Sequence, residues 1–198
     1  MGNDGSKIKV KKTKLTKKLV SDLVASTHFS EEEINILFEK YGYLSKLGHD
    51  DGTIDMEEFK EALGLRSVGF AQRIFAAFDR DNSATIEFPE YVKGLSSICP
   101  RASIDEKAKF CFGLFDVDGN GTIERQELKS VLALSMKENG SVKLTLEQLN
   151  QSVEETYRQI DTDDNGVISY DEFLGAARAN PSILNCVNVD VEHLLQKK

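Results

Sequence analysis

Apolar residues recur at three- and four-residue spacing along this chain, and four polar segments interrupt the spacing. Aromatic and branched residues precede three of these segments at helical spacing: Phe75 and Phe78, Phe112 and Phe115, Tyr157 and Ile160. Capping-box pairs mark three helix starts: Ser30 with Glu33, Ser103 with Glu106, Thr145 with Gln148. Such spacing is typical of amphipathic helices. The pattern therefore predicts an all-α fold in which helices flank four polar loops.

The four polar segments repeat one another. Each places an isoleucine four residues before a glutamate, at Ile54, Ile86, Ile123 and Ile168. A helix, loop and helix cannot bury its apolar face alone, so the units are expected to pair, with the isoleucines forming short antiparallel β-bridges between paired loops. Pro100 breaks the helical pattern between the second and third units. The predicted segments are a basic arm (1–27), two loop pairs forming two lobes (28–98 and 99–180) and an amphipathic tail (181–198).

The third and fourth segments carry a metal-binding pattern. They read DVDGNGTIERQE from Asp116 and DTDDNGVISYDE from Asp161, and both match D-x-[DN]-x-[DN]-G-x5-E in full. Calcium takes about six to eight oxygens, which a twelve-residue loop supplies from positions 1, 3, 5, 7, 9 and 12. The predicted ligands are Asp116, Asp118, Asn120, Thr122, Glu124 and Glu127 in the third loop, and Asp161, Asp163, Asn165, Val167, Ser169 and Glu172 in the fourth.

The second segment, DRDNSATIEFPE from Asp79, departs from the pattern at one position. Ala84 stands where glycine belongs, and holding alanine in a left-handed turn costs about 1 kcal/mol or more. The candidate ligands are Asp79, Asp81, Ser83, Thr85, Glu87 and Glu90. Weak calcium binding is the prediction, and a loop that only pairs with its neighbour is the alternative.

The first segment departs further. Counting twelve residues back from Glu58 puts Leu47 and His49 at ligand positions, and neither supplies a suitable oxygen. A fourteen-residue loop from Ser45 to Glu58 fits better, since backbone carbonyls can replace missing carboxylates. Its candidate ligands are Asp51, Thr53, Asp55 and Glu58.

Composition narrows the class of protein to which this chain can belong. The chain has 198 residues, 40% hydrophobic and 29% charged, which is ordinary for a folded protein. No apolar run is long enough to cross a bilayer or to serve as a secretory signal. Three cysteines without metal-ligand spacing suit reduced thiols in a cytoplasmic protein. Recognisable nucleophile motifs are lacking, and the carboxylates are committed to loops, so an enzyme is not expected.

The net charge of −8 is unevenly distributed. Residues 1–20 hold seven lysines against one acid, whereas the remaining residues carry 18 basic and 32 acidic side chains. An acidic body repels nucleic acid, and a basic arm suits an anionic surface. The arm also begins M-G-N-D-G-S, which fits N-myristoylation of Gly2. One acyl chain binds membranes only marginally, at about 10⁴ M⁻¹, so the lysines would supply the second signal.

More than one interpretation stays open for the arm and for the tail. Leu15, Leu19, Leu23 and Val24 give the arm one apolar helical face, which suits either a membrane surface or packing on the body. A nuclear-localisation signal is a third interpretation of the lysine-rich arm. In the tail, apolar residues recur at helical spacing, at Ile183, Leu184, Val187, Val191, Leu194 and Leu195. Such a helix either fills a groove of its own protein or forms part of the core.

Together these motifs resemble the superfamily of calcineurin B, calcineurin B-like and neuronal calcium sensor proteins. The segment LFEKYGYLSKLGHDDGTIDMEEF (37–59) is similar to the fourteen-residue first loop of calcineurin B-like sensors, whereas NPSIL from Asn180 is closer to neuronal sensors. The Phe-Pro-Ser-Phe tail of plant calcineurin B-like sensors is absent. The resemblance implies a Ca²⁺ sensor that docks an amphipathic helix of a protein kinase or phosphatase subunit in a hydrophobic groove and sits on membranes through a lipid.

The sequence thus predicts a calcium-dependent regulatory protein that exposes a hydrophobic groove, is cytoplasmic, and lies on membranes when myristoylated. A calcium buffer without a dedicated target is the alternative, because it would need the same loops. Neither small-molecule substrate nor nucleic acid is expected as a partner.

Overall fold

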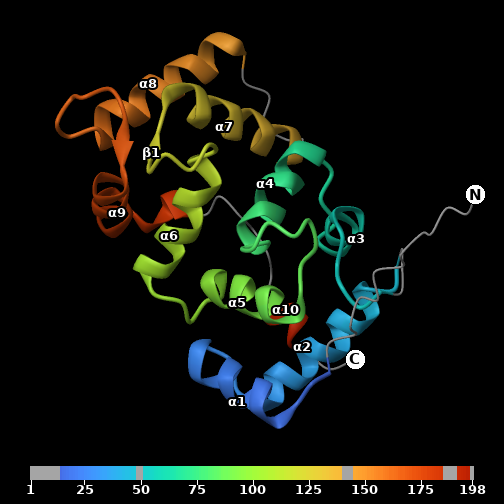
Figure 1. Ribbon diagram of the computed structural model, residues 1–198. Helices are drawn as coiled ribbons and strands as arrows, with labels where there is room; N and C mark the ends of the chain where they lie inside the picture. The colour runs from blue at the N-terminus through green and yellow to red at the C-terminus, as the bar shows by residue number, and fades with distance from the viewer. Residues whose placement is uncertain (1–13, 48–50, 140–144, 185–190, 197–198) are drawn as a thin grey trace, which may run out of the picture.

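The structure is a computed structural model that describes residues 14–47, 51–139, 145–184 and 191–196. Figure 1 shows its helical elements and the two-stranded sheet. In chain order they are α1 (Lys17–Ser26), α2 (Glu31–Leu44), α3 (Met56–Ala62), α4 (Val68–Phe78), α5 (Phe88–Ile98), α6 (Ile104–Phe115), β1 (Thr122–Ile123), α7 (Arg125–Asn139), α8 (Leu146–Ile160), β2 (Ile168–Ser169), α9 (Tyr170–Ala179), the 3₁₀ helix η1 (Pro181–Leu184) and α10 (Val191–Leu194).

The loops pair as the sequence predicted. In the N-terminal lobe, Ile54 and Ile86 form an antiparallel bridge, with N···O distances of 3.1 and 2.8 Å. In the C-terminal lobe, Ile123 pairs with Ile168 in the register of β1 and β2. Four helix–loop–helix units in two paired lobes are thereby confirmed, because each loop is joined to its mate through the predicted isoleucine.

The predicted helix starts are also confirmed. Ser30, Ser103 and Thr145 are the N-caps of α2, α6 and α8, and each forms a complete capping box. These boxes satisfy backbone N–H groups that the first helical turn leaves unpaired. Capping boxes are also present at the N-termini of α3, α5 and α9, where the N-cap residue belongs to a loop: Asp55, Glu87 and Ser169.

The two lobes share an element. Helix α6 places Phe110 and Leu114 in the N-terminal core, while Cys111 and Phe115 on the same helix belong to the C-terminal core. Helical periodicity explains this, since neighbouring positions face in different directions. The lobes are therefore in direct contact on either side of one helix.

Helix α7 makes a second contact between the lobes. Leu134 packs on the N-terminal core, and a Cβ at Gly69 of α4 would lie only 2.7 Å from Leu134 Cδ2. The Glu138 carboxylate accepts hydrogen bonds from the backbone N of Arg66, at 2.9 Å, and of Ser67, at 2.7 Å. The C-terminal end of α7 thus supplies acceptors for the backbone just before α4.

Helix α1 packs on the N-terminal lobe. Leu23 is 1% exposed and Val20 is buried in the same core, whereas Lys14, Lys17 and Lys18 are exposed. Val24, which the sequence pattern put on the apolar face, is 40% exposed. For residues 17–26 the structure favours packing on the body, the second of the two predicted arrangements.

The C-terminal segment divides between the lobes. The apolar side chains of η1 pack on the C-terminal core, whereas Val191 of α10 is 2% exposed within the N-terminal core. Figure 1 shows α10 beside α2 and α5. Val187 and Cys186 lie outside the described residues, and Cys99 and Cys111 are free buried thiols. Among the helices that the structure describes, none combines the length and apolar character of a membrane span.

Candidate functional site

Three loops bring carboxylates together. Oxygens of Asp116, Asp118 and Glu127 lie within 4.8 Å of one another, and so do those of Asp161, Asp163 and Glu172. The same holds in the second loop for the carboxylates of Asp79, Asp81 and Glu90. Positions 1, 3 and 12 of each loop thus converge on one point.

Hydrogen bonds from backbone N–H groups to aspartate side chains hold the third and fourth loops in a wrapped form. The Asp116 Oδ2 atom accepts a hydrogen bond from Gly121 N at 3.0 Å, and Asp161 Oδ2 accepts one from Gly166 N at 3.0 Å. Both glycines have positive φ, +86° and +88°, where a side chain opposes the turn. The glycine at position 6 therefore lets the loop return its backbone toward its first carboxylate.

The glutamate at position 12 closes each loop. In the third loop Glu127 Oε1 accepts from Val117 N and Oε2 accepts from Glu124 N, each at 2.8 Å. Glu172 makes the corresponding bonds to Thr162 N, at 2.8 Å, and Ser169 N, at 2.9 Å. Burial would raise the pKa of Glu172, but these hydrogen bonds lower it to about 2. The carboxylate is thus ionised at neutral pH.

Position 9 of each loop occupies the N-cap position of the following helix, in addition to its predicted place in the calcium site. Glu124 and Ser169 stand where a water-mediated ligand was predicted, and in the fourth loop Ser169 Oγ donates to Glu172 Oε2 at 2.8 Å. The remaining predicted residues support the turn: Asn120 Oδ1 accepts from Thr122 Oγ1 at 2.7 Å, and Asn165 Oδ1 from Val167 N at 2.9 Å. The sequence already held this signal, since positions 9 and 12 have capping-box spacing.

One buried atom shows that the third loop suits a cation. Asp116 Oδ1 is buried and has no hydrogen-bond partner among the described residues. An unpaired buried carboxylate oxygen is costly, so its position within a cluster of carboxylates fits a bound cation. Hard oxygen donors at this spacing match Ca²⁺.

The second loop has the same shape despite its alanine. Ala84 has φ +64°, and its N–H donates to Asp79 Oδ2 at 2.9 Å, as the glycines do in the later loops. Ser83 Oγ donates to Thr85 O at 2.9 Å, and Glu90 Oε2 accepts from Glu87 N at 3.0 Å. The predicted strain at position 6 is therefore present in the fold.

The first loop is only partly described, because residues 48–50 lie outside the described ranges. Asp51 Oδ1 accepts from Thr53 N and Thr53 Oγ1, both at 2.9 Å. Asp55 and Glu58 form the capping box of α3. Within the described part of this loop, Asp51, Asp55 and Glu58 form no three-carboxylate cluster, and calcium binding there stays a prediction.

In each lobe, a tyrosine hydroxyl forms a hydrogen bond that joins the two loops. The sequence analysis did not predict this role. Tyr157 donates its hydroxyl to Ile123 O at 2.5 Å, and Tyr41 donates to Ile86 O at 3.0 Å. Each tyrosine stands four residues before the first position of its own loop, so the spacing was visible in the sequence. Burial raises the pKa of both tyrosines, that of Tyr157 to about 12, which keeps the hydroxyl proton available for this bond.

Arg125 makes a second side-chain contact between the two loops of the C-terminal lobe. Its Nη1 donates to Gly166 O at 2.8 Å, and its guanidinium lies 4.0 Å from the Tyr157 ring centroid. A guanidinium over an aromatic face is a favourable contact. The third and fourth loops are thus joined through side chains as well as through β1 and β2.

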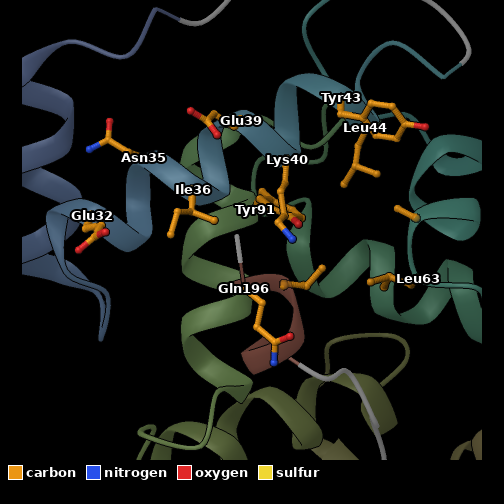
Figure 2. Close-up of a pocket in the computed structure, with 12 residues that line it drawn as sticks. Glu32, Asn35, Ile36, Glu39, Lys40, Tyr43, Leu44, Leu63, Tyr91 and Gln196 are labelled. Atoms are coloured by element: carbon orange, nitrogen blue, oxygen red, sulfur yellow. The ribbon is translucent and has the colours of Figure 1, made fainter. Parts of the chain in front are cut away.

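A pocket opens on the N-terminal lobe, with a volume of about 830 Å³. Figure 2 shows Ile36 and Leu44 of α2 on its upper side and Gln196 of the C-terminal segment below. Leu63 and Tyr91 contribute from the end of α3 and from α5. The lining side chains are Glu32, Asn35, Ile36, Glu39, Lys40, Tyr43, Leu44, Ala62, Leu63, Tyr91, Leu194 and Gln196. An apolar concavity with a charged rim suits an amphipathic helix.

Comparisons with known proteins agree with this geometry. Two family models, each described as an EF-hand domain pair, match residues 105–178 and 50–93. The calcineurin B protein of Candida glabrata is 38% identical over 160 residues, covering 80% of this chain and 87% of the relative. The human calcineurin B protein of type 2 is 32% identical, covering 77% and 86%. Calcium-binding protein NCSA of Dictyostelium discoideum is 40% identical, covering 60% and 62%.

Proposed function

Because this chain belongs to the calcineurin B-like family of EF-hand calcium-binding proteins, we propose that it acts as the calcium-dependent regulatory partner of another protein rather than as an enzyme. The target is an amphipathic helix of a calcineurin-type phosphatase catalytic subunit, and the names of the relatives favour this target over a protein kinase. The observation that carries the proposal is the apolar pocket of the N-terminal lobe.

Calcium in the first and second loops would have a direct route to this pocket. Bound Ca²⁺ supplies a positive charge that the carboxylates of the loop can share. Helices α3 and α5 both line the pocket, and their first turns hold the position-12 glutamates, Glu58 and Glu90. A shift of these glutamates toward the loop would turn both helices and change the width of the pocket.

The charged rim defines what kind of helix fits. Ile36, Leu44 and Leu63 offer apolar surface, and Glu32 and Glu39 lie at the same pocket. An amphipathic helix with leucine-like anchors and basic flanking residues would complement both. Leu194 lines one side, so a long target helix would have to displace the C-terminal segment or lie beside it.

Titration of a synthetic target-helix peptide tests this function. Peptide from a calcineurin-type catalytic subunit is expected to bind about tenfold more tightly in calcium than in chelator, a typical size for coupling between two binding sites. Ile36→Glu should weaken binding at least about tenfold, because docking would bury a charge. Leu146→Glu is the matched control, since Leu146 is 67% exposed on α8 in the other lobe.

Two outcomes would refute the proposal. If Ile36→Glu and Leu146→Glu bind the peptide equally well, the pocket is not the docking site. If neither the peptide nor a hydrophobic dye distinguishes the calcium form from the chelated form, the chain is the calcium buffer that the sequence also allowed.

We further propose that Gly2 is myristoylated and that the lysines of the arm hold the protein on anionic membranes. Gly2 lies outside the described residues, and the support comes from the sequence motif together with three exposed lysines, Lys14, Lys17 and Lys18, in the described part of the arm.

A further inference from the structure

A second cavity lies between the lobes, with a volume of about 950 Å³. Its walls come from α4, α5 and α6, which pack against one another at the centre of Figure 1, and from the second and third loops. We call it the interlobe cleft. Four cationic side chains line it: Arg73, Arg80, Lys93 and Lys109.

These cations are unusual in this body. Residues 21–198 carry 18 basic and 32 acidic side chains, so four cations at one concavity oppose the general charge. Within the described part of the chain, no carboxylate lies within ion-pair distance of any of the four. Of the acids lining the cleft, Glu106 is already hydrogen-bonded to Ser103 and to His28. The four cations are therefore available to an anion from outside.

The distribution of the cations indicates the kind of anion. Lys93 lies on α5 and Lys109 on α6, whereas Arg73 lies on α4 and Arg80 follows two residues after the end of that helix. Ala76 and Ala77 lie between them, and their small side chains keep this wall of the cleft open. A flat bilayer cannot enter a concave cleft. Cations on several elements can each meet a different carboxylate, so an extended acidic chain fits this distribution better than one small anion.

The third loop borders the cleft, so calcium bound in this loop would change the charge of the cleft. Asp116 and Asp118 line the cleft and are also ligand candidates. Four cations against these two aspartates and Glu106 leave one positive charge, and a bound Ca²⁺ would add two more. Loading of the third loop should therefore strengthen anion binding next to it.

We propose that the interlobe cleft binds an acidic peptide segment of the target protein, and that calcium in the third loop strengthens this binding. The inference rests on the proposed function only in assigning the segment to the same target as the helix. It defines a second contact, away from the apolar pocket, that recognises carboxylates instead of apolar anchors.

A labelled ten-residue Glu- and Asp-rich peptide carrying an uncharged dye tests the cleft by fluorescence anisotropy, with the Gln and Asn version as control. Lys93→Gln with Lys109→Gln should weaken binding about five- to tenfold. Lys129→Gln with Lys137→Gln on α7 removes the same charge away from the cleft and should weaken it less than about twofold. Calcium should tighten binding to the wild type about fivefold, and Glu127→Gln should abolish that gain.

The outcomes separate this inference from the proposed function. Equal effects of the two lysine pairs, or equal binding of the neutral peptide, would overturn the cleft as a site. Equal binding in calcium and chelator would overturn its control by the third loop. The Lys93 and Lys109 variant should still bind the target-helix peptide, and the Ile36→Glu variant should still bind the acidic peptide, so each site can fail alone.

Discussion

Exchanging alanine and glycine at position 6 of two loops tests whether backbone strain sets their calcium affinity. Ala84 at φ +64° and Gly121 at φ +86° occupy the same place in the second and third loops, and each N–H donates to the first aspartate of its loop. Ala84→Gly removes the strain from the second loop. Gly121→Ala introduces the same strain into the third.

The structure fixes the expected size of the effect. A left-handed conformation costs an L-residue about 1 kcal/mol or a little more, and 1 kcal/mol corresponds to about a fivefold change in affinity. A Cβ added at Gly121 would meet no atom within 4 Å, so a steric clash contributes nothing there. Ala84→Gly should therefore tighten the second site about fivefold, and Gly121→Ala should weaken the third by a similar factor.

Calorimetric calcium titration can resolve each site when the other loops are silenced. Ala84→Gly is measured in a protein that also carries Glu58→Gln, Glu127→Gln and Glu172→Gln, and Gly121→Ala in one carrying Glu58→Gln, Glu90→Gln and Glu172→Gln. Changes in the same direction, or both smaller than about 1.5-fold, would show that strain at position 6 does not limit binding.

Three further predictions concern the ligands, an ion pair and the arm. Glu127→Gln with Glu172→Gln should remove two bound calcium ions per chain in calorimetry, because each change weakens the closing ligand of its loop, and unchanged stoichiometry would contradict the assignment. Burial alone would raise the pKa of Glu33, but the hydrogen bond that its carboxylate accepts from Arg101, at 2.8 Å, lowers this pKa. Arg101→Gln should therefore cost about 0.5 kcal/mol of unfolding free energy at neutral pH, a difference that fades as falling pH protonates the carboxyl. Urea titrations at neutral and at acidic pH check this, and a constant difference would argue against it. Gly2→Ala should release the protein from anionic vesicles in flotation assays, since the lysines alone bind weakly.

The sequence was most informative where a function requires a fixed residue at a fixed place. Asp116 to Glu127 could be identified as a calcium loop because each ligand position has a chemical reason, and the capping box at Ser103 followed from short-range geometry. The conformation of Ala84 was predictable for the same reason, since the turn demands a left-handed residue whatever side chain stands there.

Contacts between distant segments were not predictable in this way. The sequence showed that Val191 and Leu194 are apolar at helical spacing, but not that α10 would lie on the N-terminal lobe. Nothing in the local sequence singled out Arg125, and only the paired loops bring Gly166 O within 2.8 Å of it. A local pattern identifies an apolar face, whereas the choice of its partner depends on the packing of the whole chain.

The sharing of α6 limits how this protein can be divided. Two pairs of hands suggest two interchangeable modules, but a cut at Pro100 would leave Phe110 and Leu114 on the C-terminal fragment without the core that covers them. The N-terminal fragment would keep a matching apolar hollow. Each half would then expose an apolar surface and tend to aggregate. Swapping lobes between relatives therefore requires transferring α6 together with the surface on which it packs.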